Sequence, residues 1–111
     1  MKRPPLPAKP TLADLQADIA ALVEQRGWED ESINDVFLLM VEEVGELAKE
    51  IRKHTGMRTD VNKPSQANQA ALEGEFADIL NYLLDLANHL GVDLERAYRN
   101  KMKEVEGRTW S

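Results

Sequence analysis

The chain has 111 residues, of which 42% are hydrophobic and 31% are charged, a composition typical of one soluble globular domain. Its formal net charge of -6 argues against general nucleic-acid binding, because phosphate contacts require clustered lysine and arginine. The chain has no cysteine, which excludes disulfides, zinc-thiolate sites and thiol catalysis. No apolar stretch approaches the length of a membrane span, so we expect a cytoplasmic protein.

The N-terminal part of the chain predicts an irregular arm followed by a helix. Residues 1–10 contain four prolines and are expected to form a flexible arm, so that the domain proper covers residues 11–111. Thr11 fits the N-cap of a first helix, because apolar residues recur at helical spacing from there until Gly27. Trp28 follows in a short acidic connection.

A second, longer helix is predicted to begin at a cap provided by Ser32 or Asn34. Its apolar surface is wider than one packed face requires, which indicates a further packing partner. It ends before a loop at residues 55–65, where a glycine and a proline break the helical pattern. This loop carries two basic residues, Arg58 and Lys63.

Two more helices complete the predicted fold. The third covers roughly residues 66–90, with Gly91 as its C-cap, and the fourth runs from an N-cap at Asp93 to about Glu106. Lys101 projects into the middle of the apolar stripe of this last helix. No strand-like alternation occurs, and the short links imply antiparallel neighbours, so we predict an all-α four-helix bundle.

Two pairs of acidic residues stand out within the apolar central helices. Glu43 and Glu46 are three residues apart, as are Glu75 and Asp78, and residues at this spacing share one face of a helix. Glu50 lies on the same border of the second helix as the first pair. Facing carboxylate pairs repel each other, and a hard divalent cation removes this repulsion. The simpler alternative is a solvated acidic face, which is the better interpretation of any single glutamate.

The predicted ligand set contains oxygen atoms only. His54 and His89 do not stand at the Glu-x-x-His spacing of di-iron bundles, and His89 is about three turns beyond Asp78. An all-oxygen site suits Mg²⁺ or Mn²⁺, and Mg²⁺ characteristically bridges carboxylates to substrate phosphates. The pattern therefore indicates phosphate chemistry.

Other polar and aromatic residues each have two interpretations. Lys101 is either a side chain whose stem packs on apolar surface or an ammonium directed at the acidic centre or a bound phosphate. Trp28 either covers the core or stacks on a base. Arg58 and Lys63 are either ordinary loop charges or substrate contacts.

Two long segments resemble the MazG-like family of all-α nucleoside triphosphate pyrophosphohydrolases. The family pattern is Glu-Glu-x-x-Glu, a spacer, and then Glu-x-x-Asp, which appears here as EEVGE at 42–46 and EFAD at 75–78. The resemblance covers roughly residues 12–108 and includes the closing Asn100-Lys101-Met102. It departs from the pattern near the C-terminus, where Val105 replaces an asparagine.

The resemblance implies Mg²⁺-dependent hydrolysis of a (d)NTP between its α and β phosphates, with Mn²⁺ as a substitute metal. In this family scheme Glu42 or its neighbour Glu43 would position and deprotonate the attacking water. The implied metal ligands are the members of the two acidic pairs, Glu43, Glu46, Glu75 and Asp78.

The resemblance also implies substrate contacts and an assembly. Lys101 and Asn100 would contact phosphate, while Trp28 and Asn34 would lie near the nucleoside. The resemblance implies a homodimer or homotetramer with sites near the subunit contacts. Such contacts would cover the wide apolar surface of the central helices. Two rival functions are phosphoribosyl-ATP pyrophosphohydrolysis, on a related fold, and a non-catalytic helical interaction module.

Overall fold

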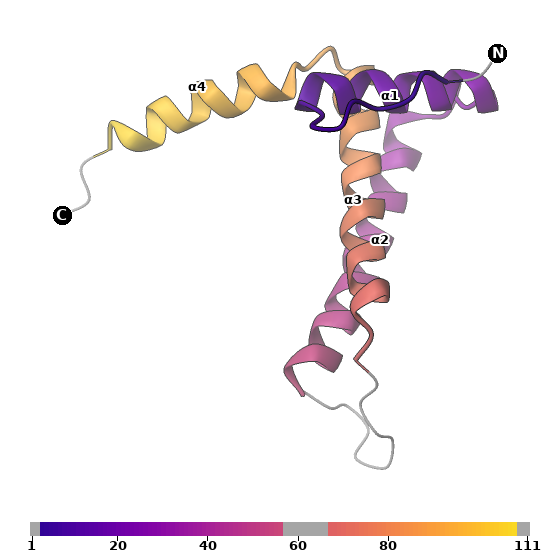
Figure 1. Cartoon of the computed structure of the whole chain (residues 1–111), viewed down its shortest axis with the longest axis vertical. Helices are drawn as coiled ribbons and strands as arrows, with labels where there is room; N and C mark the ends of the chain where they lie inside the picture. Colours follow the sequence, from indigo (N-terminus) through magenta and orange to yellow (C-terminus); the bar gives the residue numbers. More distant parts are fainter. Residues whose placement is uncertain (1–2, 57–66, 109–111) are drawn as a thin grey trace. The chain divides into compact units, whose positions relative to one another are not determined.

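The computed structural model describes residues 3–56 and 67–108, and within them the chain forms α-helices and no strand (Figure 1). This confirms the predicted all-α class. None of the helices in the described ranges is long and apolar enough to cross a membrane. The helices are α1 (Leu12–Arg26), α2 (Ile33–Thr55), α3 (Gln69–His89) and α4 (Leu94–Glu106).

The ends of α1 follow the capping chemistry expected from the sequence. The Thr11 hydroxyl accepts a hydrogen bond from the Asp14 amide at 3.1 Å, and the Asp14 carboxylate accepts one from the Thr11 amide at 2.9 Å. This reciprocal capping box satisfies two backbone donors that the first turn would otherwise leave without partners. At the other end Gly27 adopts the left-handed conformation, with φ of 71°, which glycine tolerates because it has no Cβ.

The other helices begin at polar caps, one of which had been left open. Ser32, and not Asn34, caps α2, since its side chain accepts from the Asp35 amide. α3 begins at Gln69, later than predicted, because the Asn68 side chain accepts a hydrogen bond from the Ala71 amide at 3.2 Å. Asp93 caps α4, as predicted.

The described chain forms two units, and α3 contributes to both. The first unit contains α1, α3 from Leu84 onwards and α4. The second unit runs from Ser32 to Leu83, so that it contains α2 and the earlier part of α3. In the second unit these two helices run side by side in opposite directions (Figure 1). Packing of all four helices into one bundle remains a prediction.

The amide side chain of Gln16 joins the elements of the first unit. Its Nε2 donates to Asn88 Oδ1 at 3.0 Å and to the Val92 carbonyl at 2.8 Å, while its Oε1 accepts from the Leu94 amide at 3.0 Å. Asn88 Nδ2 in turn donates to the Gln16 carbonyl at 2.8 Å. These bonds connect α1 to the end of α3 and the start of α4. The buried apolar side chains of this unit are Ile19, Leu84, Leu86 and Ala87.

The proline-rich N-terminal segment makes a contact with α1. Residues 3–10 contain no helix or strand, and the Arg3 Nε atom lies 3.0 Å from Asp18 Oδ1. Because Arg3 is partly exposed, we expect this ion pair to add little to the stability of the domain. The predicted flexibility of the segment remains a prediction.

We predict that Gln16→Ala lowers the free energy of unfolding by about 2 kcal/mol, because it leaves part-buried donors and acceptors without partners. Urea denaturation followed by circular dichroism measures this change. Gln69→Ala, at an exposed position in the first turn of α3, is the matched control and should change stability by less than about 0.5 kcal/mol. Equal losses for the two variants would contradict the role given to Gln16.

Candidate metal centre

Three carboxylates of the second unit come together between α2 and α3. One ligand oxygen from each of Glu43, Glu75 and Asp78 lies within 4.8 Å of the other two. Glu43 and Glu75 are half-buried, whereas Asp78 is exposed. The group therefore sits at the edge of the packed helix pair, where a ligand from solvent can reach it.

The local structure explains why these three side chains meet. Glu75 and Asp78 are three residues apart on α3, which places them on one face and on successive turns. Glu43 comes from the middle of α2, which runs antiparallel to this part of α3. Val36, two turns before Glu43 on α2, is almost fully buried, with 1% of its surface exposed.

The proximity of these groups changes the protonation of Glu75. Its hydrogen bond with Glu43, its burial and the negative charges of Glu43, Asp78 and Glu46 together raise the pKa of Glu75 to about 7. The metal-free cluster thus relieves its like-charge repulsion by retaining a proton. Such a raised pKa is typical of functional sites, although structural clusters of charge also produce it.

The donor set fits a hard divalent cation. All the contributing atoms are carboxylate oxygens, the ligands that Mg²⁺ and Mn²⁺ prefer. Glu75 Oε2 is buried and has no hydrogen-bond partner among the described residues. A buried carboxylate oxygen without a partner is costly, and a cation bound between these side chains would satisfy it.

The chain matches the model of a known protein family. The model of the MazG nucleotide pyrophosphohydrolase domain matches residues 31–109, which is more than half of the chain and includes all three clustered carboxylates. The chain belongs to this family. The MazG-like resemblance seen in the sequence is therefore confirmed.

Individual relatives and a solved structure agree with membership of the MazG family. The human protein dCTP pyrophosphatase 1 is 36% identical over 85% of this chain and 56% of its own length. The dATP/dGTP diphosphohydrolase of cyanophage S-2L is 33% identical over 91% of this chain and 79% of its own length. The crystal structure of YpjD from Bacillus subtilis is 28% identical, with a TM-score of 0.75 and coverage of 93% of this chain and 100% of that chain.

The mammalian relatives are longer than this chain, so their names describe more than the part that the chain matches. The chain spans little more than half of the curated dCTP pyrophosphatases from rat, human, cow and mouse that it matches. Their activity as whole proteins is therefore a basis for a proposal about this MazG domain, and the cluster geometry supplies independent support.

Two acidic residues of the predicted MazG site lie outside the close group. Glu46 is exposed, and its carboxylate is not among the oxygens within 4.8 Å of one another. It is still near enough for its charge to raise the pKa of Glu75. Glu42 is exposed on α2, one residue before Glu43 and therefore about 100° around the helix. The roles predicted for Glu42 and Glu46 remain predictions.

The residues expected to contact phosphate lie mainly on α4. Lys101 Nζ is 3.4 Å from Glu104 Oε2, and the lysine side chain is 57% exposed. It therefore faces solvent and pairs with a residue of its own helix. Asn100 is also exposed. Arg58 and Lys63 lie outside the described residues.

The two residues expected near the nucleoside belong to different units. Trp28 is 45% exposed in the first unit, and the Arg26 guanidinium lies 5.9 Å from the centre of its indole ring. This distance is consistent with a cation-π contact. Asn34 is exposed in the first turn of α2, in the second unit. Substrate binding by either residue remains a prediction.

Neither histidine is part of the acidic cluster. His54 Nδ1 lies 3.0 Å from the Glu50 carbonyl, one turn earlier in α2. His89 Nε2 lies 3.3 Å from Asp85 Oδ1, and both side chains line a cavity of about 390 Å³ in the first unit. A ligand set without imidazole remains a prediction.

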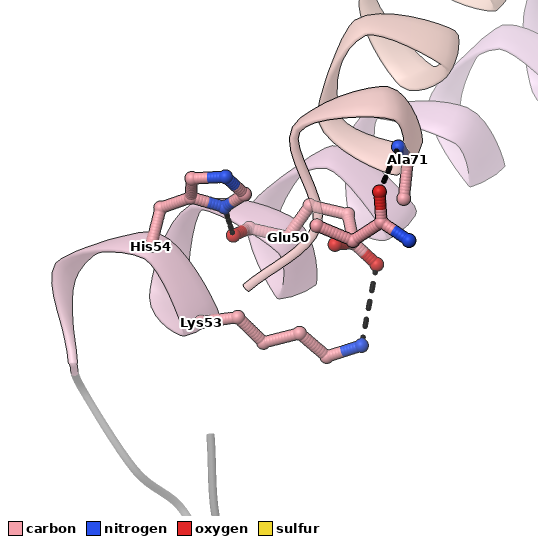
Figure 2. A network of polar contacts seen from close by, with 5 residues as sticks. Glu50, Lys53, His54 and Ala71 are labelled. Atoms are coloured by element: carbon pink, nitrogen blue, oxygen red, sulfur yellow. Dashed lines mark hydrogen bonds and ion pairs between the residues drawn. The ribbon is translucent and has the colours of Figure 1, made fainter. Parts of the chain in front are cut away.

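Glu50 and Lys53 form an ion pair near the C-terminal end of α2. Glu50 is buried, with 9% of its surface exposed, and its Oε1 lies 3.3 Å from Lys53 Nζ (Figure 2). The sequence already places this pair on the same face of α2 as the acidic cluster. The spacing of three, four and three residues puts on one helix face Glu43, Glu46, Glu50 and Lys53.

The raised pKa of Glu75 predicts how the stability of the metal-free protein depends on pH. Between pH 4.5 and about 7 the folded state binds the Glu75 proton and the unfolded state has lost it, so stability falls as pH rises through this interval. Denaturation in the presence of a chelator, repeated across this interval, measures the effect. Glu75→Gln should flatten the dependence.

The exposed residue Glu73 provides the control for this measurement. It stands two residues before Glu75 and therefore on the opposite side of α3. Glu73→Gln should leave the pH dependence of the wild type in place. A Glu75→Gln profile as steep as the wild-type profile would show that another group binds the proton.

Proposed function

We propose that this MazG-family chain hydrolyses nucleoside triphosphates between the α and β phosphates, with Mg²⁺ bound at the acidic cluster. The observation that carries the proposal is the convergence of Glu43, Glu75 and Asp78 from two helices on one point, with a buried oxygen of Glu75 left without a partner. Burial of a carboxylate oxygen is costly unless a hydrogen bond or a bound ion satisfies it. The family match and the relatives' names support the same reaction.

The named relatives differ in the base that they accept. The rat and human proteins are named for dCTP, whereas the cyanophage protein is named for dATP and dGTP. A shared phosphate chemistry with a variable base is consistent with a metal site built on α2 and α3. We therefore propose the class (d)NTP as the substrate of this chain, with removal of surplus or non-canonical nucleotides as its purpose.

Each acidic residue has a proposed task in this reaction. Glu43, Glu75 and Asp78 would hold the metal, and Glu46, on the same face of α2, would complete or support the set. Mg²⁺, if held by these residues, would neutralise charge on the polyphosphate and lower the pKa of a bound water. Glu42, or Glu43 beside it, orients the attacking water and accepts its proton. The water oxygen forms a bond to the α phosphorus as the bond from this atom to the bridging oxygen breaks, and pyrophosphate leaves.

The test of the proposal is pyrophosphate release from purified protein. The panel contains dCTP, dATP, dGTP, dTTP, the ribonucleotides, modified dNTPs and phosphoribosyl-ATP, each with Mg²⁺, with Mn²⁺ and with a chelator. Metal-dependent formation of NMP and pyrophosphate is the expected result. Turnover of phosphoribosyl-ATP alone would replace the proposed substrate, and a folded protein without activity on any compound would overturn the proposal.

We predict that Asp78→Asn lowers turnover at least about 100-fold. Replacing a residue that only hydrogen-bonds to a metal ligand commonly lowers activity 10–100-fold, and Asp78 is proposed as a ligand itself. The fold should survive, since Asp78 is exposed and its neutralisation removes like-charge repulsion. Thermal unfolding measured with and without Mg²⁺ should show stabilisation by metal in the wild type and little in the variant. Glu73→Gln is the control, and equal loss of activity in that variant would contradict the assignment.

We also propose that the chain forms a homodimer or homotetramer through its second unit. Exposed apolar side chains line one face of α2 and one face of α3, in each case at positions i, i+4 and i+7. Contiguous exposed apolar faces on both helices are typical of protein interfaces. The side chains are Phe37, Val41 and Val44 on α2 and Phe76, Leu80 and Leu83 on α3, each between 37% and 57% exposed.

We predict that light scattering during gel filtration gives a multiple of the 12.5 kDa chain mass. The double substitution Val41→Glu with Leu80→Glu should reduce this to the monomer mass, because it places charges within a desolvated interface. Tyr98→Glu, at a position 62% exposed on α4, adds a charge to the other unit and should leave the assembly intact. A monomeric wild type at micromolar concentration would contradict this proposal.

A further inference from the structure

The proline-rich segment at residues 3–10 is a sequence feature that the proposed reaction does not use. It lies outside residues 31–109, which match the MazG model, and all of its residues are exposed. Each residue in the range 3–7 is either a proline or the residue before one. Proline fixes φ near the polyproline II value, and a residue that precedes proline is kept away from the helical region. This part of the chain is therefore biased towards the extended polyproline II helix.

The described structure agrees with this bias. Residues 3–7 form no helix, strand or bend, and the backbone bends only afterwards, at Ala8 and Lys9. Within residues 3–10, Ala8 alone neither is a proline nor precedes one. The restricted part of the segment thus ends where the sequence stops restricting the backbone.

Two prolines of the restricted part share one edge of it. A polyproline II helix has three residues per turn, so Pro4 and Pro7 lie one turn apart on the same side. Pro5 lies on a different side. The segment therefore presents the P-x-x-P arrangement that several classes of peptide-binding domain recognise.

The segment is held in place without belonging to the core. At one end the Arg3 Nε atom lies 3.0 Å from Asp18 Oδ1, and at the other end the chain enters the cap of α1 at Thr11. Between these ends, residues 4–7 and α1 together line a cavity of about 290 Å³ (Figure 1). Leu6 is 45% exposed. The apolar side chains of the segment are thus not used to pack the domain, and a partner can reach them.

We propose that residues 3–9 bind a protein partner whose groove is lined by aromatic side chains. Such grooves, found in SH3, WW and EVH1 domains, recognise P-x-x-P segments because a preformed polyproline II helix loses little entropy on binding. Pro4 and Pro7 enter the groove from their shared edge. Lys9 is exposed two residues after Pro7 and adds a positive charge, so the matching groove carries an acidic side chain beside its aromatic residues.

The first test measures binding of the full chain to a panel of purified SH3, WW and EVH1 domains by biolayer interferometry. The expected result is saturable binding to at least one domain, displaced by a synthetic peptide of residues 3–9. No binding to any domain of the panel would overturn the proposal. Binding that the peptide does not displace would also overturn it, because the contact would then lie elsewhere on the chain.

The second test uses the three-residue period of the segment. Pro4→Ala and Pro7→Ala should each weaken binding at least about tenfold, since each removes a side chain from the edge that enters the groove. Pro5→Ala removes a proline from another edge and should weaken binding less than about threefold. It is the matched control, because all three changes relax the backbone of the unbound chain in the same way. Equal weakening by the three variants would overturn the P-x-x-P assignment.

The third test concerns the charge beside the prolines. Lys9→Met should weaken binding and reduce its dependence on salt concentration, because it removes the ammonium that faces the acidic side chain of the groove. Lys103→Met removes the same charge from an exposed position on α4 and should leave the affinity unchanged. Equal effects of the two variants would show attraction by overall charge and would overturn the role of Lys9.

A stability measurement separates partner binding from packing against α1. The urea midpoints of Pro4→Ala and Pro7→Ala should equal that of the wild type, because both prolines are exposed. Lowered midpoints together with unchanged affinity for the panel would show that the segment is a structural strap on α1, and the proposal would then be wrong.

Discussion

Repulsion among carboxylates at the edge of the helix pair is the constraint on which the second unit depends. One carboxylate oxygen from each of Glu43, Glu75 and Asp78 lies within 4.8 Å of the other two, and the three residues come from two helices. Without a cation, the protein neutralises the cluster by keeping a proton on Glu75 near neutral pH. The packing of α2 against α3 must therefore offset the repulsion among these carboxylates, which lowers the free energy of unfolding. Such a local cost is common where a functional site requires several like charges close together.

The helical architecture followed closely from local chemistry in the sequence. The predicted and observed limits of α1, α2 and α4 agree within a residue or two, because a polar cap begins each helix and a glycine follows each one, in the left-handed conformation after α1 and α2. The start of α3 was placed too early, since Gln66 and Ala67 continue a helical composition and only the Asn68 cap distinguishes them. The choice between Ser32 and Asn34 also required coordinates, because both residues cap helices well.

The candidate site was only partly predictable, for reasons that lie in side-chain geometry. Spacing of three residues places Glu75 and Asp78 on one face, and the structure brings both to Glu43. At 100° per residue Glu43 lies further inward on α2 than Glu46, and the structure agrees, since Glu43 joins the close group and Glu46 does not. Spacing does not decide between the two interpretations of Lys101, whose partner Glu104 lies one turn along its own helix. The burial of Glu50 depends on what packs against α2, and the spacing of residues within α2 carries no information about that.

The paired amides of the first unit have a consequence for the chemical ageing of the protein. Gln16 and Asn88 use their NH₂ groups as donors to oxygen atoms, so their orientation is fixed. Deamidation of either residue would exchange these donors for a carboxylate oxygen facing carbonyl or amide oxygens. Attraction would become repulsion at the junction of α1, α3 and α4. Slow deamidation during storage should therefore weaken this unit long before the acidic cluster changes.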